Sequence, residues 1–159
     1  MPWRQAFFSS QFARRGLTSR LLLGLALLFG CAVLWTQPSA ADGALAIALP
    51  SDVVKVGFAY GAGYNYPTAG EAQQKALENC KKTKSDVRKK LCAIINTFKN
   101  QCFAVAMDPA DGTPGVGWAV AADLRSSDAE ALAKCEATAG PGRRAACKVD
   151  SSGCDGTAK

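Results

Sequence analysis

The residues best suited to chemistry in this chain of 159 residues are its seven cysteines, because the sequence contains no histidine. Structural zinc sites and dithiol redox sites ordinarily use C-x-x-C pairs, and none is present. Cysteines in a short chain without these spacings are typical of a disulfide framework in an oxidising compartment. We therefore predict disulfides, with no metal and no other cofactor.

Carboxylates offer the remaining route to catalysis. Without histidine, the chain lacks the usual base that activates a serine or cysteine nucleophile. Asp108, Asp111 and Asp123 lie around a predicted hairpin, and two carboxylates about 5–9 Å apart can hydrolyse glycosides. Such acids equally serve as turn formers and solvated strand ends, which we favour. We predict no catalytic residue and keep a carboxylate-only hydrolase as the alternative function.

One segment between two cysteines, residues 81–90, is strongly basic and contains a single acid, Asp86. It is suited to contact anionic surfaces such as lipid headgroups, wall polymers or nucleic acid. The alternative is a solvated helix end whose cations oppose the helix dipole. The candidate contact residues are Lys81, Lys82, Lys84, Arg88, Lys89 and Lys90.

Aromatic residues supply a second candidate binding feature. Tyr64 and Tyr66 lie in the glycine-rich segment 61–67, which we interpret as a turn, and two amphipathic rings can line a sugar or peptide site. Packing of the turn explains the pair equally well. We expect Phe58 and Trp118 to be core residues at equivalent positions of two repeats.

The first 41 residues have the pattern of an export signal. Basic residues without any acid precede the apolar run Leu21–Trp35, and small residues follow up to Ala41. A run of 15 residues is shorter than the ~20 that span a bilayer, so we predict cleavage after Ala41 rather than a permanent anchor. The alternatives are an uncleaved N-terminal anchor and lipidation at Cys31, where Leu28–Cys31 is similar to a lipobox.

Removal of residues 1–41 changes both the charge and the cysteine count. The remaining chain has fifteen basic and thirteen acidic residues, a net charge of +2, and six cysteines. An even number of cysteines fits an exported protein, periplasmic or extracellular. With so little net charge we expect no specific nucleic-acid partner, and membrane contact only through the signal peptide or weak surface charge.

The predicted mature domain, residues 42–159, contains two similar units. Ala76-Leu-x-x-Cys80 parallels Ala131-Leu-x-x-Cys135, and Gly57-Phe-Ala parallels Gly117-Trp-Ala. Eleven residues separate the paired cysteines in each unit. We predict repeats at 44–101 and 102–154, followed by a short tail, 155–159.

The repeat also predicts the pairing of the cysteines. Cys80–Cys92 and Cys135–Cys147 would each tie the end of a helix to the following strand. Cys102–Cys154 would then bridge the two units. In the chain-entropy model, closing loops of this size is worth about 3 kcal/mol each.

Each unit is expected to fold as β-β-α-β. Capping boxes at Thr68–Glu71 and Ser127–Glu130 predict two helices, the first one turn longer. Six short runs predict strands, and the units should form one mainly antiparallel sheet with two helices, an α+β fold stapled by disulfides. The predicted strands are 45–49, 53–60, 91–98, 102–107, 116–121 and 146–149.

The duplicated order of these motifs resembles the secreted bacterial domain-of-unknown-function family 4189 over residues 44–154. The resemblance implies export and this fold, and it supplies no activity or active-site residues. Two features depart from the family pattern: the basic segment replaces a glycine-containing loop like Ala139–Gly142, and the first helix has the extra turn.

Together these features predict an uncharacterised secreted or periplasmic binding or interaction module without catalytic activity. Its partner would be a protein or another envelope component, and we expect a monomer. The alternatives are the carboxylate-only hydrolase and a binder of anionic envelope surfaces acting through residues 81–90.

Overall fold

The computed structural model describes residues 42–159, which contain two three-stranded antiparallel sheets. The predicted signal peptide, with Cys31 and the cleavage site after Ala41, lies outside the described residues. Within residues 42–159, no helix is both long enough and apolar enough to cross a bilayer.

The first sheet and its helices occupy residues 42–98. The strand order is β2-β1-β3, so the first strand of the chain is central. The elements are β1 (Asp42–Ala48), α2 (Val53–Val56), β2 (Ala59–Tyr66), α3 (Ala69–Cys80), α4 (Asp86–Leu91) and β3 (Ala93–Phe98).

The second sheet has the corresponding order β5-β4-β6, again with its first strand in the centre. A 3-10 turn, η1, precedes its last strand. The elements are β4 (Cys102–Met107), β5 (Val116–Ala121), α5 (Leu124–Thr138), η1 (Arg144–Ala146) and β6 (Lys148–Cys154).

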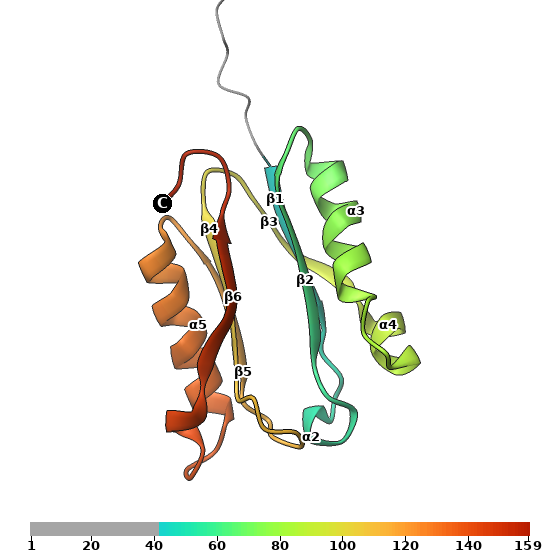
Figure 1. The fold of residues 1–159 in the computed structure, drawn as a ribbon, viewed down its shortest axis with the longest axis vertical. Coiled ribbons are helices and arrows are strands. Elements are labelled where there is room, and N and C mark those ends of the chain that lie inside the picture. The colour runs from blue at the N-terminus through green and yellow to red at the C-terminus, as the bar shows by residue number, and fades with distance from the viewer. Residues whose placement is uncertain (1–41) are drawn as a thin grey trace, which may run out of the picture. The chain divides into compact units, whose positions relative to one another are not determined.

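The two sheets face each other, with α5 covering the outer side of one and α3 and α4 lying outside the other (Figure 1). The α+β class is therefore confirmed, but the prediction of a single sheet is wrong. The cause lies in the central strands, which are buried on both faces. In β1, Ala44 and Ala46 pack towards α3, whereas Leu45 and Ile47 enter a core shared with Phe103 of β4. A single sheet with helices on one side would leave those larger side chains in water.

The second strand differs from its prediction. Residues 53–56 form the short helix α2, capped by Asp52, and the glycine-rich segment predicted as a turn is most of β2. Glycine is needed in β2 because α3 crosses it closely: a Cβ on Gly61 would lie 2.2 Å from the backbone nitrogen of Cys80. A Cβ on Gly117 of β5 would likewise lie only 2.4 Å from the backbone nitrogen of Cys135 in α5.

The predicted start of the second long helix is also wrong. Thr68 caps α3 as expected, but α5 begins one turn earlier than predicted, with Asp123 as its cap. Ser127 is instead buried inside the helix, where its hydroxyl donates to the carbonyl of Leu124. Both helices now place their cysteine twelve residues after the cap, at Cys80 and at Cys135, so the extra turn disappears.

Contacts with the long helices show how positions in the two sheets correspond: a Cβ on Gly61 would meet Ala76 and Cys80 of α3, and a Cβ on Gly117 would meet Ala131 and Cys135 of α5. Ala46 pairs with Gly61 in the first sheet, and Ala106 pairs with Gly117 in the second. The structural counterpart of Gly117 is thus Gly61, and not Gly57 as the motif comparison indicated. An ancestral duplication remains a prediction from the sequence.

The residue before each helical cysteine fastens the helix to an edge strand. Asn79 donates its side-chain amide to the carbonyl of Ala62 in β2 at 2.8 Å. Lys134 donates its ammonium group to the carbonyl of Trp118 in β5 at 3.0 Å. These bonds satisfy strand carbonyls and position both helix ends.

Candidate functional site

Three disulfides hold the framework, and all three predicted pairings are confirmed. Two of them join the last turns of α3 and α5 to the residues preceding β3 and β6. The third joins Cys102 and Cys154, which face each other on neighbouring strands β4 and β6. It therefore lies within the second sheet, and the prediction that it bridges the two units is wrong. The first pair, Cys80–Cys92, encloses the basic segment at both ends.

The basic segment, residues 81–90, is a turn followed by most of helix α4. Ser85 caps this helix by accepting a hydrogen bond from the backbone N–H of Arg88. The predicted loop is thus half helical, and its conformation is held by a cap and a disulfide. Side chains on it are presented from a defined backbone.

Two of the six cations in the basic segment bind groups within the domain. Arg88 turns inward and donates from Nη1 to the carbonyl of Phe58 at 3.0 Å, so it ties α4 to the start of β2. Lys89 forms an ion pair with Asp86 at 2.9 Å, and hydrogen bonding to Lys89 lowers the pKa of that carboxyl.

The other four cations of the basic segment are exposed and have no acidic partner within residues 42–159. We call them the lysine surface. They are Lys81, Lys82, Lys84 and Lys90.

Aliphatic side chains are exposed beside the lysine surface. On α4, Val87 is 55% exposed and Leu91 is 39% exposed. Residues four apart share one side of a helix, so these two side chains are neighbours. All the large hydrophobic residues exposed in the described part of the chain lie between residues 49 and 95.

Charge is divided unevenly between the two halves. Residues 42–101 contain nine basic and five acidic residues, a net charge of +4. Residues 102–159 contain six basic and eight acidic residues, a net charge of −2. The first half of the domain therefore carries the positive charge. The same half contains all the exposed large hydrophobic side chains of the described residues.

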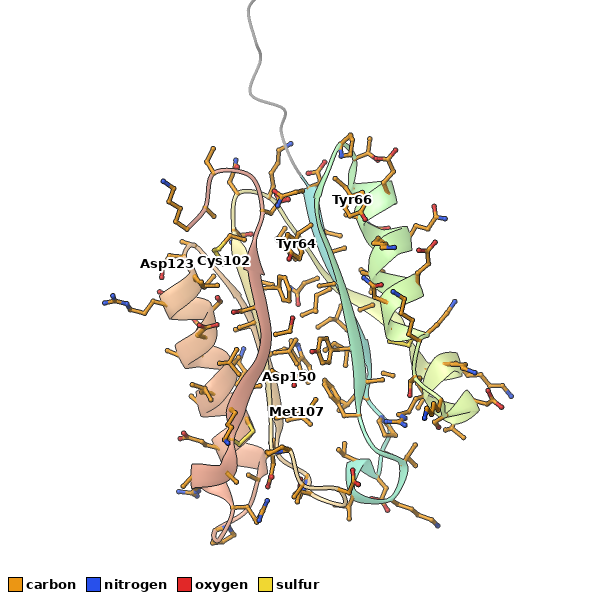
Figure 2. The ribbon with its side chains drawn as sticks, in the orientation of Figure 1. Tyr64, Tyr66, Cys102, Met107, Asp123 and Asp150 are labelled. Atoms are coloured by element: carbon orange, nitrogen blue, oxygen red, sulfur yellow. A yellow bond between two sulfur atoms is a disulfide. The ribbon has the colours of Figure 1, made fainter. Side chains whose placement is uncertain are left out.

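The two candidate tyrosines are not brought together. Tyr64 lies between the sheets, where its ring centroid is 5.4 Å from that of Phe103, whereas Tyr66 packs on the α3 side of the first sheet (Figure 2). Asn65 separates them with a φ of 62°, in the left-handed region, which breaks the usual alternation of the strand. Phe58 and Trp118 stack with centroids 6.2 Å apart beside the shared core.

Tyr60 makes a contact between the sheets that the sequence did not reveal. Its hydroxyl donates to the carboxylate of Asp150 in β6. Burial, followed by the hydrogen bond and the nearby negative charge, raises the pKa of Tyr60 to about 12. Ninety positions separate the two residues, and neither belongs to a motif, so no sequence signal could have paired them.

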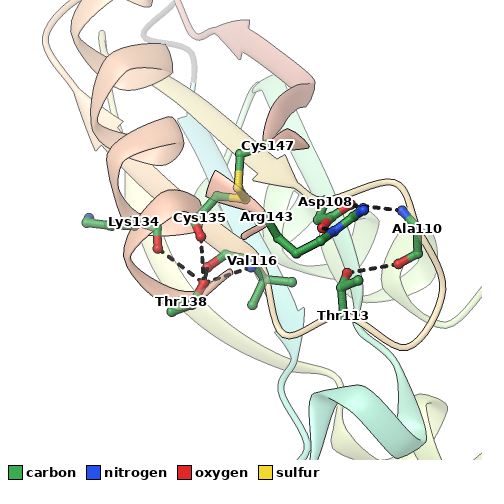
Figure 3. Close-up of a disulfide and its surroundings, with 9 residues drawn as sticks. All are labelled: Asp108, Ala110, Thr113, Val116, Lys134, Cys135, Thr138, Arg143 and Cys147. Atoms are coloured by element: carbon green, nitrogen blue, oxygen red, sulfur yellow. Dashed lines mark hydrogen bonds and ion pairs between the residues drawn. A yellow bond between two sulfur atoms is a disulfide. The ribbon is translucent and has the colours of Figure 1, made fainter. Parts of the chain in front are cut away.

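The three candidate carboxylates are dispersed. Asp108 is fully buried in its side chain and accepts two hydrogen bonds from Arg143, at 2.6 and 2.7 Å (Figure 3). Asp123 caps α5 at the other end of the β4–β5 hairpin, beside Cys102 (Figure 2). At about 3.3 Å per residue, the six steps between Cys102 and Asp108 put these acids roughly 20 Å apart. Asp111 is exposed in the turn.

Comparison with known families identifies the domain. The family model described as Domain of unknown function (DUF4189) matches residues 31–154, most of the chain. The chain belongs to this family. No curated protein matches the chain, and no solved structure matches it.

The structure resolves one of the two departures noted in the sequence and leaves the other. The extra helical turn is absent, because α3 and α5 have the same distance from cap to cysteine. The basic segment remains distinctive within this DUF4189 domain: the corresponding stretch of the second half, between Cys135 and Cys147, has two cations, Arg143 and Arg144.

The C-terminal tail of the DUF4189 domain contains a buried polar residue. Asp155 is inaccessible to solvent and accepts hydrogen bonds from the backbone N–H groups of Asn65 (2.7 Å) and Asn100 (3.3 Å). Its neighbour Gly156 donates to the side chain of Asn65. The tail therefore ties the end of β2 to the connection between β3 and β4, a role that its short polar sequence did not indicate.

A groove of about 960 Å³ lies where the two halves of the domain meet. One wall comes from the segment around α2, with Leu49 and Val54, and the other comes from β5 and α5, with Trp118. Lys134 lies at the groove, but its ammonium group already donates to the Trp118 carbonyl.

Proposed function

We propose that this protein is an exported, non-catalytic binding module that attaches as a monomer to an anionic surface of the cell envelope. The observation that carries the proposal is the lysine surface. Its four exposed cations have no acidic partner within residues 42–159 and are presented from a segment closed by a disulfide. Three disulfides support an oxidising compartment outside the cytoplasm.

The fixed backbone matters for affinity. A flexible basic loop would lose conformational freedom on binding, and this loss would offset part of the electrostatic gain. Here the helix cap at Ser85 and the Cys80–Cys92 bridge have already restricted the segment. Each lysine close to an anionic surface contributes about 1 kcal/mol at ordinary ionic strength. Four of them are enough for measurable, salt-sensitive attachment.

The proposal is tested by reversing charge on one half of the domain at a time. We expect the protein with its disulfides formed to be retained on immobilised polyphosphate and on vesicles containing phosphatidylglycerol, and to be released by salt. A variant with all four residues of the lysine surface changed to glutamate should lose this retention.

The matched control carries the same change of charge on exposed residues of the second half: Arg125→Glu, Arg144→Glu, Lys148→Glu and Lys159→Glu. It should keep most of the retention. If the two variants weaken retention equally, net charge alone explains the binding and the proposed site is wrong.

A further inference from the structure

We infer that the lysine surface binds the anionic lipid bilayer itself, with Val87 and Leu91 entering the headgroup region. This inference rests on the proposed function and names its partner. A soluble polyanion would contact the lysines alone, whereas a bilayer offers both negative charge and an apolar layer beneath it.

The geometry of α4 places the two kinds of side chain next to each other. Arg88 points inward to the Phe58 carbonyl and so fixes which side of the helix faces the domain. At about 100° per residue, Lys90 is then directed almost opposite to Arg88, away from the domain. Val87 is three residues from Lys90 and therefore adjacent to it on the helix surface.

The exposure of the two aliphatic residues lacks any other explanation in the described structure. Neither joins a core cluster within residues 42–159, although Leu77 and Ile94, on the neighbouring elements α3 and β3, do. Val87 keeps 55% of its surface in contact with solvent inside the most basic segment of the chain. This combination is typical of a surface that lies on an anionic membrane.

The preformed helix α4 also favours binding to the bilayer. Short amphipathic helices usually have to fold when they reach a bilayer, and this ordering costs binding free energy. In this protein α4 is already formed, because Ser85 caps it and the disulfide holds the following residue, Cys92. Val87, Leu91 and Lys90 therefore act from a preformed helix, and the other three residues of the lysine surface lie in the turn that precedes it.

The test separates apolar insertion from electrostatic attraction. The double variant Val87→Ser and Leu91→Ser should bind vesicles of phosphatidylglycerol and phosphatidylcholine roughly tenfold more weakly than the unchanged protein, because two half-exposed aliphatic groups no longer leave water. Its retention on immobilised polyphosphate should be unchanged. Vesicles of phosphatidylcholine alone should bind neither protein.

A matched control removes equally exposed aliphatic groups elsewhere. Leu49→Ser and Val54→Ser change residues that are 48% and 49% exposed at the groove, and this variant should bind vesicles as the unchanged protein does. If it loses vesicle binding while the α4 variant keeps it, lipid binds at the groove and the inference is wrong.

The remaining outcomes distinguish the inference from the proposed function. If the α4 variant binds vesicles normally while the glutamate variant of the lysine surface binds neither vesicles nor polyphosphate, the lysines bind anions without insertion. The inference then fails and the proposed function stands. If the glutamate variant retains both activities, both proposals fail.

Discussion

The hydroxyl of Tyr60 in β2 donates to the carboxylate of Asp150 in β6, and thereby links the two facing sheets at one edge. Elsewhere the sheets are held mainly by the apolar core around Leu45, Val105 and Phe103. A polar bond between layers is directional, so it fixes their relative position in a way that side-chain packing alone does not. This pair provides the first prediction.

Tyr60→Phe should destabilise the protein at neutral pH by about 1 kcal/mol, because one partly exposed hydrogen bond to a charged acceptor is lost. Urea unfolding followed by circular dichroism measures this change. Tyr64→Phe is the control, since the Tyr64 hydroxyl has no hydrogen-bond partner among residues 42–159, and it should leave stability within experimental error.

The hydrogen bond between Tyr60 and Asp150 also predicts that the stability of the fold decreases at alkaline pH. The folded state raises the pKa of Tyr60 from 10.0 to about 12, so below pH 10 the residue is neutral in both states and contributes no pH dependence. Between pH 10 and pH 12 the unfolded chain releases the proton first, and stability falls. Tyr60→Phe should remove this part of the decline.

Tyrosinate absorbance gives an independent measurement, because the chain has only three tyrosines. One of them should ionise near pH 12 in the unchanged protein, and this late phase should be missing from Tyr60→Phe. A late phase that persists in the variant would show that another tyrosine is responsible.

The ion pair between the buried carboxylate of Asp108 and the half-exposed Arg143 provides a prediction for acid pH. Hydrogen bonding to Arg143, followed by the backbone N–H of Ala110, lowers the pKa of Asp108 below its ordinary value of 3.8. A lowered pKa stabilises the folded state above pH 3.8, and this contribution is lost as the pH falls through the folded-state pKa.

Asp108→Asn should therefore lower the midpoint of thermal unfolding at pH 7 and reduce its decline below pH 4. The control is Asp111→Asn in the same turn, which is exposed and forms no ion pair within the described chain, and it should reproduce the unchanged acid profile. Identical profiles for the two variants would contradict a stabilising role for the Asp108–Arg143 pair.

The close crossing of α3 over β2 provides a steric prediction. Gly61→Ala would place a Cβ 2.2 Å from the backbone nitrogen of Cys80 and 2.3 Å from the carbonyl oxygen of Ala76, and backbone atoms cannot move aside without displacing the helix. We expect a loss of at least 2 kcal/mol, of the order seen when a packed core is overfilled.

Gly70→Ala in α3 is the matched control, because nothing lies within 4 Å of the added Cβ. Alanine in a helix is favoured over glycine by roughly 0.5–1 kcal/mol, so this variant should be slightly stabilised. Urea unfolding of both variants measures the difference, and a tolerated Gly61→Ala would mean that the helix lies farther from the strand than described.

Local signals predicted some elements well and others badly. The strands at 102–107 and 116–121 have the bounds expected from their β-branched and apolar runs, and the turn residues between them form the predicted hairpin. The strand at 59–66 was missed because glycine is normally unfavourable in strands. Its glycines are explained only by the helix that crosses them, a contact between residues nearly twenty positions apart.

The candidate site residues were also predicted only in part from the sequence. Residues 81–90 were found from composition alone, but composition did not show that Arg88 would turn inward and that Lys89 would pair with Asp86. The tyrosine pair was expected from adjacency in the sequence, and one backbone angle at Asn65 separates its members. Spacing identifies residues of suitable type, whereas side-chain direction depends on the surrounding backbone.

The sequence by itself determined the cysteine pairs, the family, the α+β class and the uneven distribution of charge, because each of these depends on residue type and spacing along the chain. Only the tertiary structure decided that two sheets face each other, that Tyr60 meets Asp150, and that Asp155 is buried where β2 meets the connection between β3 and β4. Hydrophobic periodicity shows that a strand has two apolar faces, but it does not say what covers each face. That choice depends on long-range packing, which the local pattern does not encode.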